Sequence, residues 1–346
     1  MRQPIALSDQ TQLPTGASAQ PPTSLPIVIL VPSYRCETTI VETLESIQDQ
    51  GESLSRIRTV IVADDGSGDR TAEVARSAWK SPVPLQILER HFNCGEYASV
   101  NNAVEQFQPE IEWFLIMHAD NIAKPGWLQA FLNRIPQATE DVALIGSSHD
   151  SLSENGRVQP GECEPPDRVV TVLGTKAAVA DTLRMGCWWH ISSCAIRVAA
   201  FRKVGGLPKI MQLKGDWDFM LRVLADGWTI EHLPRSLMLY RDNPAGSSSI
   251  TFRRHMDIWE TMTVVGRFHQ VLSGNSLARI HARHLWYLLR RMLRAILNLN
   301  IVRFVWTFPA VACVLASYSS CILNRERQTK IICRRAVVTA SDCIQG

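Results

Sequence analysis

Acidic side chains follow several short apolar segments of this sequence. Asp64 and Asp65 come directly after one apolar run, and Asp120 closes another. Asp216 lies much later, in the sequence Gly-Asp-Trp-Asp. Carboxylates in such positions can accept hydrogen bonds from a nucleoside, bind a hard divalent cation or act as a general base. The sequence therefore directs attention to a polar ligand site that is built from widely separated segments.

Apolar runs alternate with segments of helical periodicity, which predicts an α/β fold with a mostly parallel sheet flanked by helices. Such sheets bind ligands beyond the carboxyl ends of their strands, where the acidic residues lie. We expect strands at residues 25–31, 57–63, 85–89, 113–117 and 142–147. We expect helices at residues 36–50, 69–79, 95–107 and 217–226. Residues 150–185 have no clear pattern and are expected to form loops.

Ordered pieces of this sequence resemble the family 2 glycosyltransferases of GT-A type, with a Rossmann-like sheet. They are VILVPSYRCE, VADDGSGDRT, RHFNCGEYASVNNAV, LIMHADNIAKPGW, and GDWDFMLRVLADGW followed by LYRDNPAGSSS. The resemblance covers residues 25–250. It implies an inverting enzyme that moves a sugar from a nucleotide-diphosphate donor to a hydroxyl acceptor. No G-x-G-x-x-G follows the first strand, which disfavours a dinucleotide-binding domain.

The resemblance implies a donor site at the strand ends. Pro32 and Tyr34 would face the base, Glu37 would reach the nucleoside, and Arg241 would clamp the diphosphate from a closing loop. The full donor set that it implies is Pro32, Tyr34, Glu37, Asp64, Asp65, Asn93, Gly95, Asn101, His118 and Arg241. Ordinary turns and helix caps are the alternative roles for the Asp, Asn and Gly residues in this set.

The metal position of the family maps onto Asp120, with Mn²⁺ or Mg²⁺ as the cofactor. His118 stands where the family has its first Asp. Contact with ribose, with water or with the metal is one set of roles for His118, and a satisfied strand-end histidine without a ligand is the alternative. Imidazole suits softer metals than these.

The family's general base maps onto Asp216, although Gly215 replaces the Glu that usually precedes it. Helix capping is the alternative role for Asp216. The expected acceptor-binding residues are Trp188, Trp189, Trp217 and Asp218. For the tryptophans the alternative is core packing, and for Asp218 it is a cap or a pair with a neighbour such as Arg222.

The C-terminal part of the chain is basic and apolar. Residues 261–346 hold 12 Lys and Arg but 2 Asp and Glu, whereas residues 1–260 hold 24 and 31. Its Leu, Ile, Trp and Phe content favours an anionic membrane surface over nucleic acid as the partner. Residues 277–297 read as an amphipathic helix with one basic side. Residues 304–323 are uncharged and near the length of a span, so spanning and lying on the membrane both stay open. Packing of both helices on the catalytic body is the alternative to membrane contact.

We therefore expect a disordered lead-in at residues 1–24, a GT-A domain at 25–254 and a membrane-associated helical tail at 255–346. The lead-in lacks the apolar core of a signal peptide. The nine cysteines lack C-x-x-C pairs, which favours a reducing, cytoplasmic setting. Together with the basic, apolar tail, this predicts a position at the inner face of the plasma membrane. Processive polysaccharide synthases carry a Gln-x-x-Arg-Trp signature, which this sequence lacks. The resemblance therefore implies the addition of a single sugar, in cell-surface glycan or glycolipid synthesis. The alternatives are a nucleotidyltransferase acting on sugar phosphates and a non-catalytic nucleotide- or membrane-binding relative.

Overall fold

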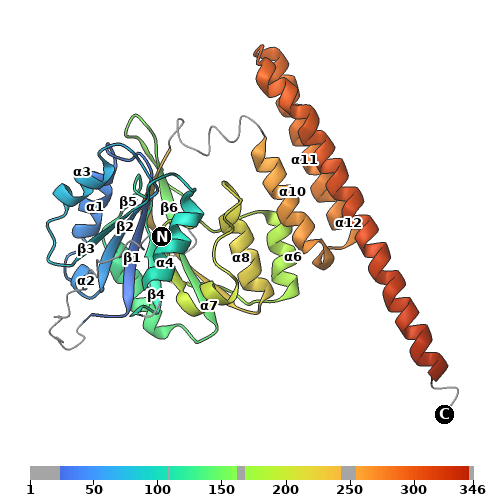
Figure 1. Cartoon of the computed structure of the whole chain (residues 1–346), viewed down its shortest axis with the longest axis horizontal. Helices are drawn as coiled ribbons and strands as arrows, with labels where there is room; N and C mark the ends of the chain where they lie inside the picture. Colours follow the sequence, from blue (N-terminus) through green and yellow to red (C-terminus); the bar gives the residue numbers. More distant parts are fainter. Residues whose placement is uncertain (1–23, 108–109, 162–167, 243–254, 343–346) are drawn as a thin grey trace, which may run out of the picture.

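A curved sheet forms the centre of the molecule (Figure 1). The computed structural model describes residues 24–107, 110–161, 168–242 and 255–342, with side chains described as far as Arg325. The expected lead-in and most of the expected closing loop, including Asn243, lie outside the described residues.

The ten-stranded sheet has the order β3-β2-β1-β4-β9-β6-β10-β5, with β7 and β8 paired at its side. Strands β1 to β4 are mutually parallel where they pair, β9 is antiparallel to both β4 and β6, and β6 is parallel to β10. The strands are β1 Ile27–Ser33, β2 Thr59–Asp64, β3 Leu85–Glu89, β4 Trp113–Ile116, β5 Ile122–Ala123, β6 Val142–Leu152, β7 Val158–Gln159, β8 Val170–Val172, β9 Cys194–Arg197 and β10 Thr229–Arg241. The expected mixed α/β architecture is confirmed, with one antiparallel strand inserted near the middle.

Helices cover both faces of the sheet, because successive residues of the central strands are mostly apolar and point to opposite faces. Ile29 belongs to a core cluster that includes residues of α1, α2, α3 and α5, whereas Leu30 belongs to the cluster that includes residues of α4, α6, α7 and α8. These helices are α1 Ile40–Gln48, α2 Glu52–Ser55, α3 Thr71–Ala78, α4 Glu96–Phe107, α5 Trp127–Arg134, α6 Lys176–Met185, α7 Val198–Lys203 and α8 Gly215–Ala225. Helix α6 and the short strand β8 correct the expectation that residues 150–185 are loops.

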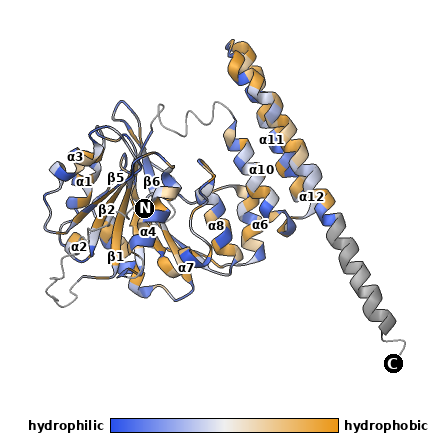
Figure 2. Cartoon of the chain, viewed as in Figure 1, coloured by the Kyte–Doolittle hydropathy of each residue, from blue (hydrophilic) through white to orange (hydrophobic). Residues whose placement is uncertain are grey.

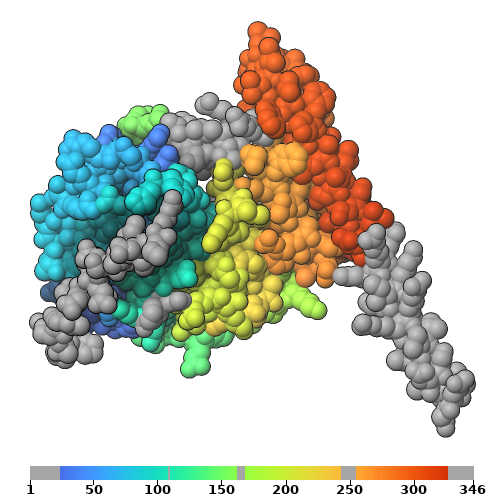
Figure 3. Space-filling model, viewed as in Figure 1, coloured from blue at the N-terminus to red at the C-terminus, as the bar shows by residue number. Residues whose placement is uncertain are grey.

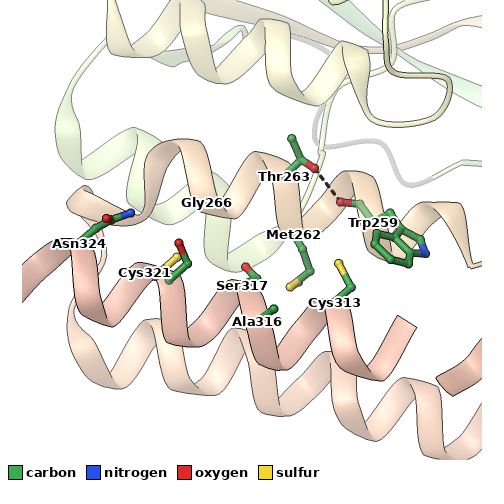
Figure 4. Close-up of a pocket in the computed structure, with 10 residues that line it drawn as sticks. Trp259, Met262, Thr263, Gly266, Cys313, Ala316, Ser317, Cys321 and Asn324 are labelled. Atoms are coloured by element: carbon green, nitrogen blue, oxygen red, sulfur yellow. Dashed lines mark hydrogen bonds between the residues drawn. The ribbon is translucent and has the colours of Figure 1, made fainter. Parts of the chain in front are cut away.

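Among the described residues, three α-helices follow the sheet: α10 Met256–Phe268, α11 Gly274–Leu297 and α12 Ile301–Asp342. Helices α11 and α12 form a long hairpin, and α10 lies between this hairpin and α8 (Figures 1 and 3). A crevice of about 370 Å³ between α10 and α12 is lined mainly by small and sulfur-containing side chains (Figure 4).

The hairpin is apolar on its surface toward the turn between α11 and α12 (Figure 2). Its exposed apolar side chains in this region include Leu289, Leu293, Ile296, Leu297, Leu299, Ile301, Val302, Val305, Trp306 and Phe308. Leu288, which the sequence places on the same apolar side of α11, is instead buried between the helices. Within the part of the chain that the structure describes, the segment Ile301–Arg325 alone is long and apolar enough to cross a membrane, with a mean hydropathy of 1.6.

A buried ion-pair cluster joins α8 to α10. Asp218 has an exposed fraction of 0% and accepts from Arg222 Nε at 2.8 Å and from Arg267 of α10. Arg222 also donates to the backbone oxygens of Val204 and Gly206. The pairing of Asp218 with Arg222 is therefore confirmed, and its expected contact with an acceptor is wrong, because both carboxylate oxygens are occupied inside the core.

Asp218→Ala should lower the free energy of unfolding by about 3 kcal/mol, since removing one partner of a buried ion pair leaves the other charges unpaired. Asp181→Ala is the control, because Asp181 belongs to an exposed i,i+3 pair on α6 and should change stability by less than about 1 kcal/mol. Urea unfolding monitored by tryptophan fluorescence measures both. Equal losses for the two variants would contradict the structural role of the cluster.

Candidate functional site

The strand ends of β1, β2 and β4 open into one pocket of about 360 Å³. Of the sequence-predicted residues, it is lined by Pro32, Tyr34, Asp65, Asn93, Gly95, His118 and Asp120. The parallel register places Ser33 beside Asp64, and β4 pairs with the other edge of β1. Side chains that are far apart in sequence therefore meet at one rim.

The Asp64-Asp65 pair holds the loops of this rim together. Asp64 accepts from the backbone N–H of Ser67 at 3.2 Å and from the Ser67 hydroxyl, so it shapes its own turn. Asp65 reaches the neighbouring loop, where it accepts from the N–H of Cys94 at 3.1 Å and of Gly95 at 2.7 Å. Asp65 lines the pocket and Asp64 does not.

Two glycines allow these loops to approach one another. Gly66 has φ +71°, and a Cβ there would lie 2.6 Å from the backbone carbon of Phe92. Gly95 has φ +91° at the start of α4, a conformation that residues with a side chain rarely adopt. A larger residue at position 66 would therefore separate the two loops that Asp65 joins, whereas at position 95 a side chain would meet open space and strain only the backbone.

Besides Asp64, three predicted donor residues are absent from the pocket lining. Glu37 is exposed and accepts from the backbone N–H of Arg70 at 3.1 Å. Asn101 bonds the backbone N–H and oxygen of Leu207, each at 2.8 Å. The Arg241 guanidinium pairs with Glu42 and donates to the backbone oxygen of Asp120 at 2.9 Å. In this structure the three side chains bond to neighbouring protein groups, and their contact with a donor stays a prediction.

An ion pair occupies the position where the family pattern has its first Asp. His118 Nε2 lies 3.0 Å from Glu96 Oε1, at the start of α4. Burial alone would lower the pKa of His118, but the carboxylates of Glu96, Asp120 and Asp216 raise it to about 9. The pocket wall beside Asp120 therefore carries a positive imidazolium, and burial raises the pKa of Asp120 despite that charge.

Asp216 lies in the first turn of α8 and is not among the residues that line the pocket, but the charges of the pocket wall act on it. Burial raises its pKa to about 6, against the opposing effects of the Trp217 N–H and Lys214. The charges of Glu96 and His118 also act on it, so Asp216 is close to the residues at the pocket rim. A carboxylate with this pKa is ionised at neutral pH and can accept a proton.

Gly215 is explained by Tyr97. A Cβ at position 215 would lie 2.1 Å from Cε2 of Tyr97, whose ring is buried against the start of α8 and lines the pocket. The aromatic ring therefore occupies the space of the Glu that the family pattern has at this position.

The predicted acceptor residues do not share the pocket. Trp189 and Trp217 are buried, with exposed fractions of 3% and 4%, in the core. Trp188 lines a different cavity of about 740 Å³ beside α6 and β8. Trp189 and Trp217 therefore pack in the core, which was the alternative to the expected binding of the acceptor sugar. Rings that the sequence did not single out lie next to His118 instead: His190, with a ring centroid 6.2 Å away, and beyond it His149 and Tyr240.

Several lining residues were not predicted from the sequence. They are Ser33, Arg35, Cys36, Thr38, Thr39, Ala63, Glu96, Tyr97, Ser99, Ala119, Met211 and Gln212. Arg35 is the cation among them on the β1 side, where its backbone N–H donates to Ser67 Oγ at 2.9 Å. Its position directly after Tyr34 was a usable signal, whereas Met211 and Gln212 lie in a segment with no motif.

The pocket suits a hard divalent cation held together with a phosphate ligand. Among the described residues no group of three metal-ligating side chains comes together. Mg²⁺-type sites commonly use one or two carboxylates and take their remaining ligands from substrate phosphates and water. Asp120 is half-buried at the pocket wall and fits that arrangement.

Known proteins share this fold. A mannosyltransferase from Pyrobaculum calidifontis, in complex with GDP-Man and Mn²⁺, superimposes with a TM-score of 0.55 at 16% identity, over 88% of this chain and 90% of that one. S. aureus TarS residues 1–349, in complex with UDP-GlcNAc, gives a TM-score of 0.54 at 16% identity, over 85% and 91%. These similarities confirm the expected GT-A fold.

Curated relatives are similar over shorter stretches. The uncharacterized glycosyltransferase EpsJ of Bacillus subtilis is 23% identical over 239 residues, which cover 67% of this chain and 66% of EpsJ. An uncharacterized glycosyltransferase of Haemophilus influenzae is 30% identical over 129 residues, 37% of this chain and 38% of that protein. The matches thus span less than two thirds of either relative.

The family profile described as "Glycosyl transferase family 2" matches residues 28–203, which include β1, the Asp64-Asp65 turn, the Asn93 loop and Asp120. This stretch covers half of the chain. The chain therefore belongs to glycosyl transferase family 2.

Proposed function

We propose that the protein transfers a single sugar from a nucleotide-diphosphate donor to a hydroxyl acceptor. The observation that carries this proposal is the convergence of Asp65 and Asp120 on one pocket, with Asp216 close enough for the same charges to act on its pKa. Family membership supports the same chemistry.

The donor nucleoside is proposed to lie against Pro32, Tyr34 and Asp65, where β1 and β2 end. Asn93 and Gly95 would line the path of the diphosphate at the beginning of α4, where helix N–H groups favour an anion. Structures of similar fold hold UDP-GlcNAc and GDP-Man, which supports a nucleotide-sugar but leaves the base and the sugar to experiment.

Asp120 is the proposed ligand for Mn²⁺ or Mg²⁺. When bound, the cation would neutralise charge on the departing nucleoside diphosphate. His118, held by Glu96 3.0 Å away, would add a second positive charge on the same wall. The residues of this chain thus provide one carboxylate and one imidazolium where the family pattern has two carboxylates.

Asp216 is the proposed general base. It would accept the proton of the acceptor hydroxyl while that oxygen bonds to the anomeric carbon and the bond from this carbon to the diphosphate oxygen breaks. A single displacement of this kind inverts the anomeric configuration, which agrees with the inversion that the resemblance implies.

The proposed membrane contact is the apolar end of the α11–α12 hairpin. Arg290, Arg294 and Arg303 lie among its exposed apolar side chains, so this end presents both hydrophobic and positive groups to an anionic bilayer. We propose that the tail, residues 255–346, holds the catalytic domain, residues 25–254, at the cytoplasmic face of the plasma membrane. Its acceptor there would be a glycan or lipid-linked precursor of cell-surface glycans or glycolipids.

Asp216→Asn should reduce kcat by about 10²–10⁴-fold, the usual contribution of a general base. The kcat/KM of the wild type should fall as the pH drops through about 6, because protonation removes the base. Asp226→Asn, at the other end of α8, is the control and should keep wild-type rates. A wild-type rate in Asp216→Asn would contradict this role.

Donor binding should depend on a divalent cation. Thermal-shift assays with UDP-, GDP- and dTDP-sugars test this dependence. In the presence of Mn²⁺, the sugars of one nucleotide should raise the free energy of unfolding of the wild type by about 2.7 kcal/mol at a donor concentration 100 times Kd. EDTA should abolish the shift, as should Asp120→Asn, while Asp181→Asn on α6 should retain it. No shift with any donor would favour a non-catalytic relative.

The hairpin end should carry membrane binding. The protein should float with vesicles that contain phosphatidylglycerol, and the double variant Leu293→Asp/Val305→Asp should bind at least about tenfold more weakly, since each buried apolar side chain contributes about 1.5–3 kcal/mol. Val158→Asp, at an exposed apolar position of β7, is the matched control. Undiminished flotation of the double variant would place the contact elsewhere.

A further inference from the structure

Helix α8 carries Asp216 in its first turn, where the Asp216 carboxylate accepts from the backbone N–H of Trp217 at 2.7 Å. Its N-cap residue is Lys214, whose side chain accepts no hydrogen bond from the helix. The first N–H groups of a helix lack partners within the helix and need acceptors from elsewhere. The loop before α8 has the same requirement, because Met211 is buried and Leu213 and Lys214 are half-buried.

Glu260 of α10 supplies hydrogen-bond acceptors for this loop, up to the N-cap residue of α8. Its carboxylate accepts from the backbone N–H groups of Gln212 at 2.8 Å, Leu213 at 2.8 Å and Lys214 at 2.7 Å. Glu260 has an exposed fraction of 5%. Charge-assisted hydrogen bonds of this kind are stronger than neutral ones. A negative group near the N-terminus of α8 also interacts favourably with the positive end of the helix dipole.

The loop held by Glu260 connects two parts of the candidate site. Met211 and Gln212 line the donor pocket, and Asp216 follows Lys214 by two residues in the first turn of α8. A second contact from the same helix, between Arg267 and Asp218, fixes the next part of α8. Helix α10 therefore holds α8 at two neighbouring points.

We infer that Glu260 is a positioning residue for Asp216 and for the Met211–Gln212 wall of the donor pocket. The inference rests on the proposed function for its catalytic consequence, and on hydrogen-bond geometry for its structural part. Glu260 lies beyond the family match at residues 28–203, so the tail contributes to the scaffold of the site.

The same helix connects this scaffold to the hairpin. Val264 and Val265 of α10 pack in the core of the catalytic domain, whereas Ile258 and Met262 pack against Leu288, Ala310 and Val314 of the hairpin. The crevice of Figure 4 lies along this second contact. Removal of the hairpin would therefore expose one side of the helix that carries Glu260.

The test compares two buried carboxylates of α10. Glu260→Gln and Glu260→Ala remove the charge or the whole acceptor. Asp257→Asn is the matched control, because Asp257 is equally buried but pairs with Arg291 of α11, 2.7 Å away, and not with the loop. Unfolding midpoints of all variants establish that each one is folded.

Glu260→Ala should reduce kcat by up to about 10²-fold, the cost of a small misplacement of a catalytic group, and Glu260→Gln by less. The acid limb of the pH–rate profile should move below the wild-type value, because a loosened loop exposes Asp216 to water. Asp257→Asn should leave kcat and the acid limb unchanged. Unchanged kcat and acid limb in both Glu260 variants, or equal effects in Asp257→Asn, would overturn the inference.

Hydrogen exchange separates this inference from the proposed function. In Glu260→Ala, the amides of residues 212–214 should exchange at least about tenfold faster, while those of β1 stay protected and Asp257→Asn shows no change in the loop. Protection that persists in Glu260→Ala would overturn the inference even in an active enzyme. Lost protection in a protein whose wild type transfers no sugar would refute the proposed function and leave the positioning role standing.

Discussion

The parallel pairing of β1 with β2 and β4 is the constraint on which the candidate site depends. Parallel strands end at the same edge, so Ser33, Asp64 and the turn after β4 come together without any proximity in sequence. The buried Asp65 then links that edge to the loop before α4 through two backbone N–H groups. Every later feature of the pocket, including the position of Asp120, relies on this shared edge.

Helix α4 accounts for both departures of the chain from the family pattern. Glu96, its first residue, pairs with His118, and Tyr97, its second, fills the space in front of Gly215. Each unusual residue thus has a neighbour of complementary charge or shape from the same helical turn. The two changes alter the charge beside Asp120 while they keep the pocket wall closed.

Much of the fold could be predicted from the sequence, because strands buried on both faces are continuous apolar runs and the polar clusters follow them directly. The burial of Trp189 and Trp217 could not be predicted, because tertiary contacts that no local pattern encodes decide whether an indole packs in the core or contacts a ligand. Helix α6 was missed since its residues Lys176–Met185 mix polar and apolar types without a clear period. Glu260 gave no signal, because its partners are backbone N–H groups 46 to 48 residues away.

Helix α10 is packed into the catalytic core on one side and into the hairpin on the other. The domain and the hairpin therefore cannot swivel independently, as they would on a flexible linker. With the hairpin end in a bilayer, the pocket mouth would keep a fixed height above the lipid headgroups and a fixed orientation to them. The enzyme would then meet membrane-bound acceptors by lateral diffusion in two dimensions, and the reach of an acceptor above the surface would decide whether it is used.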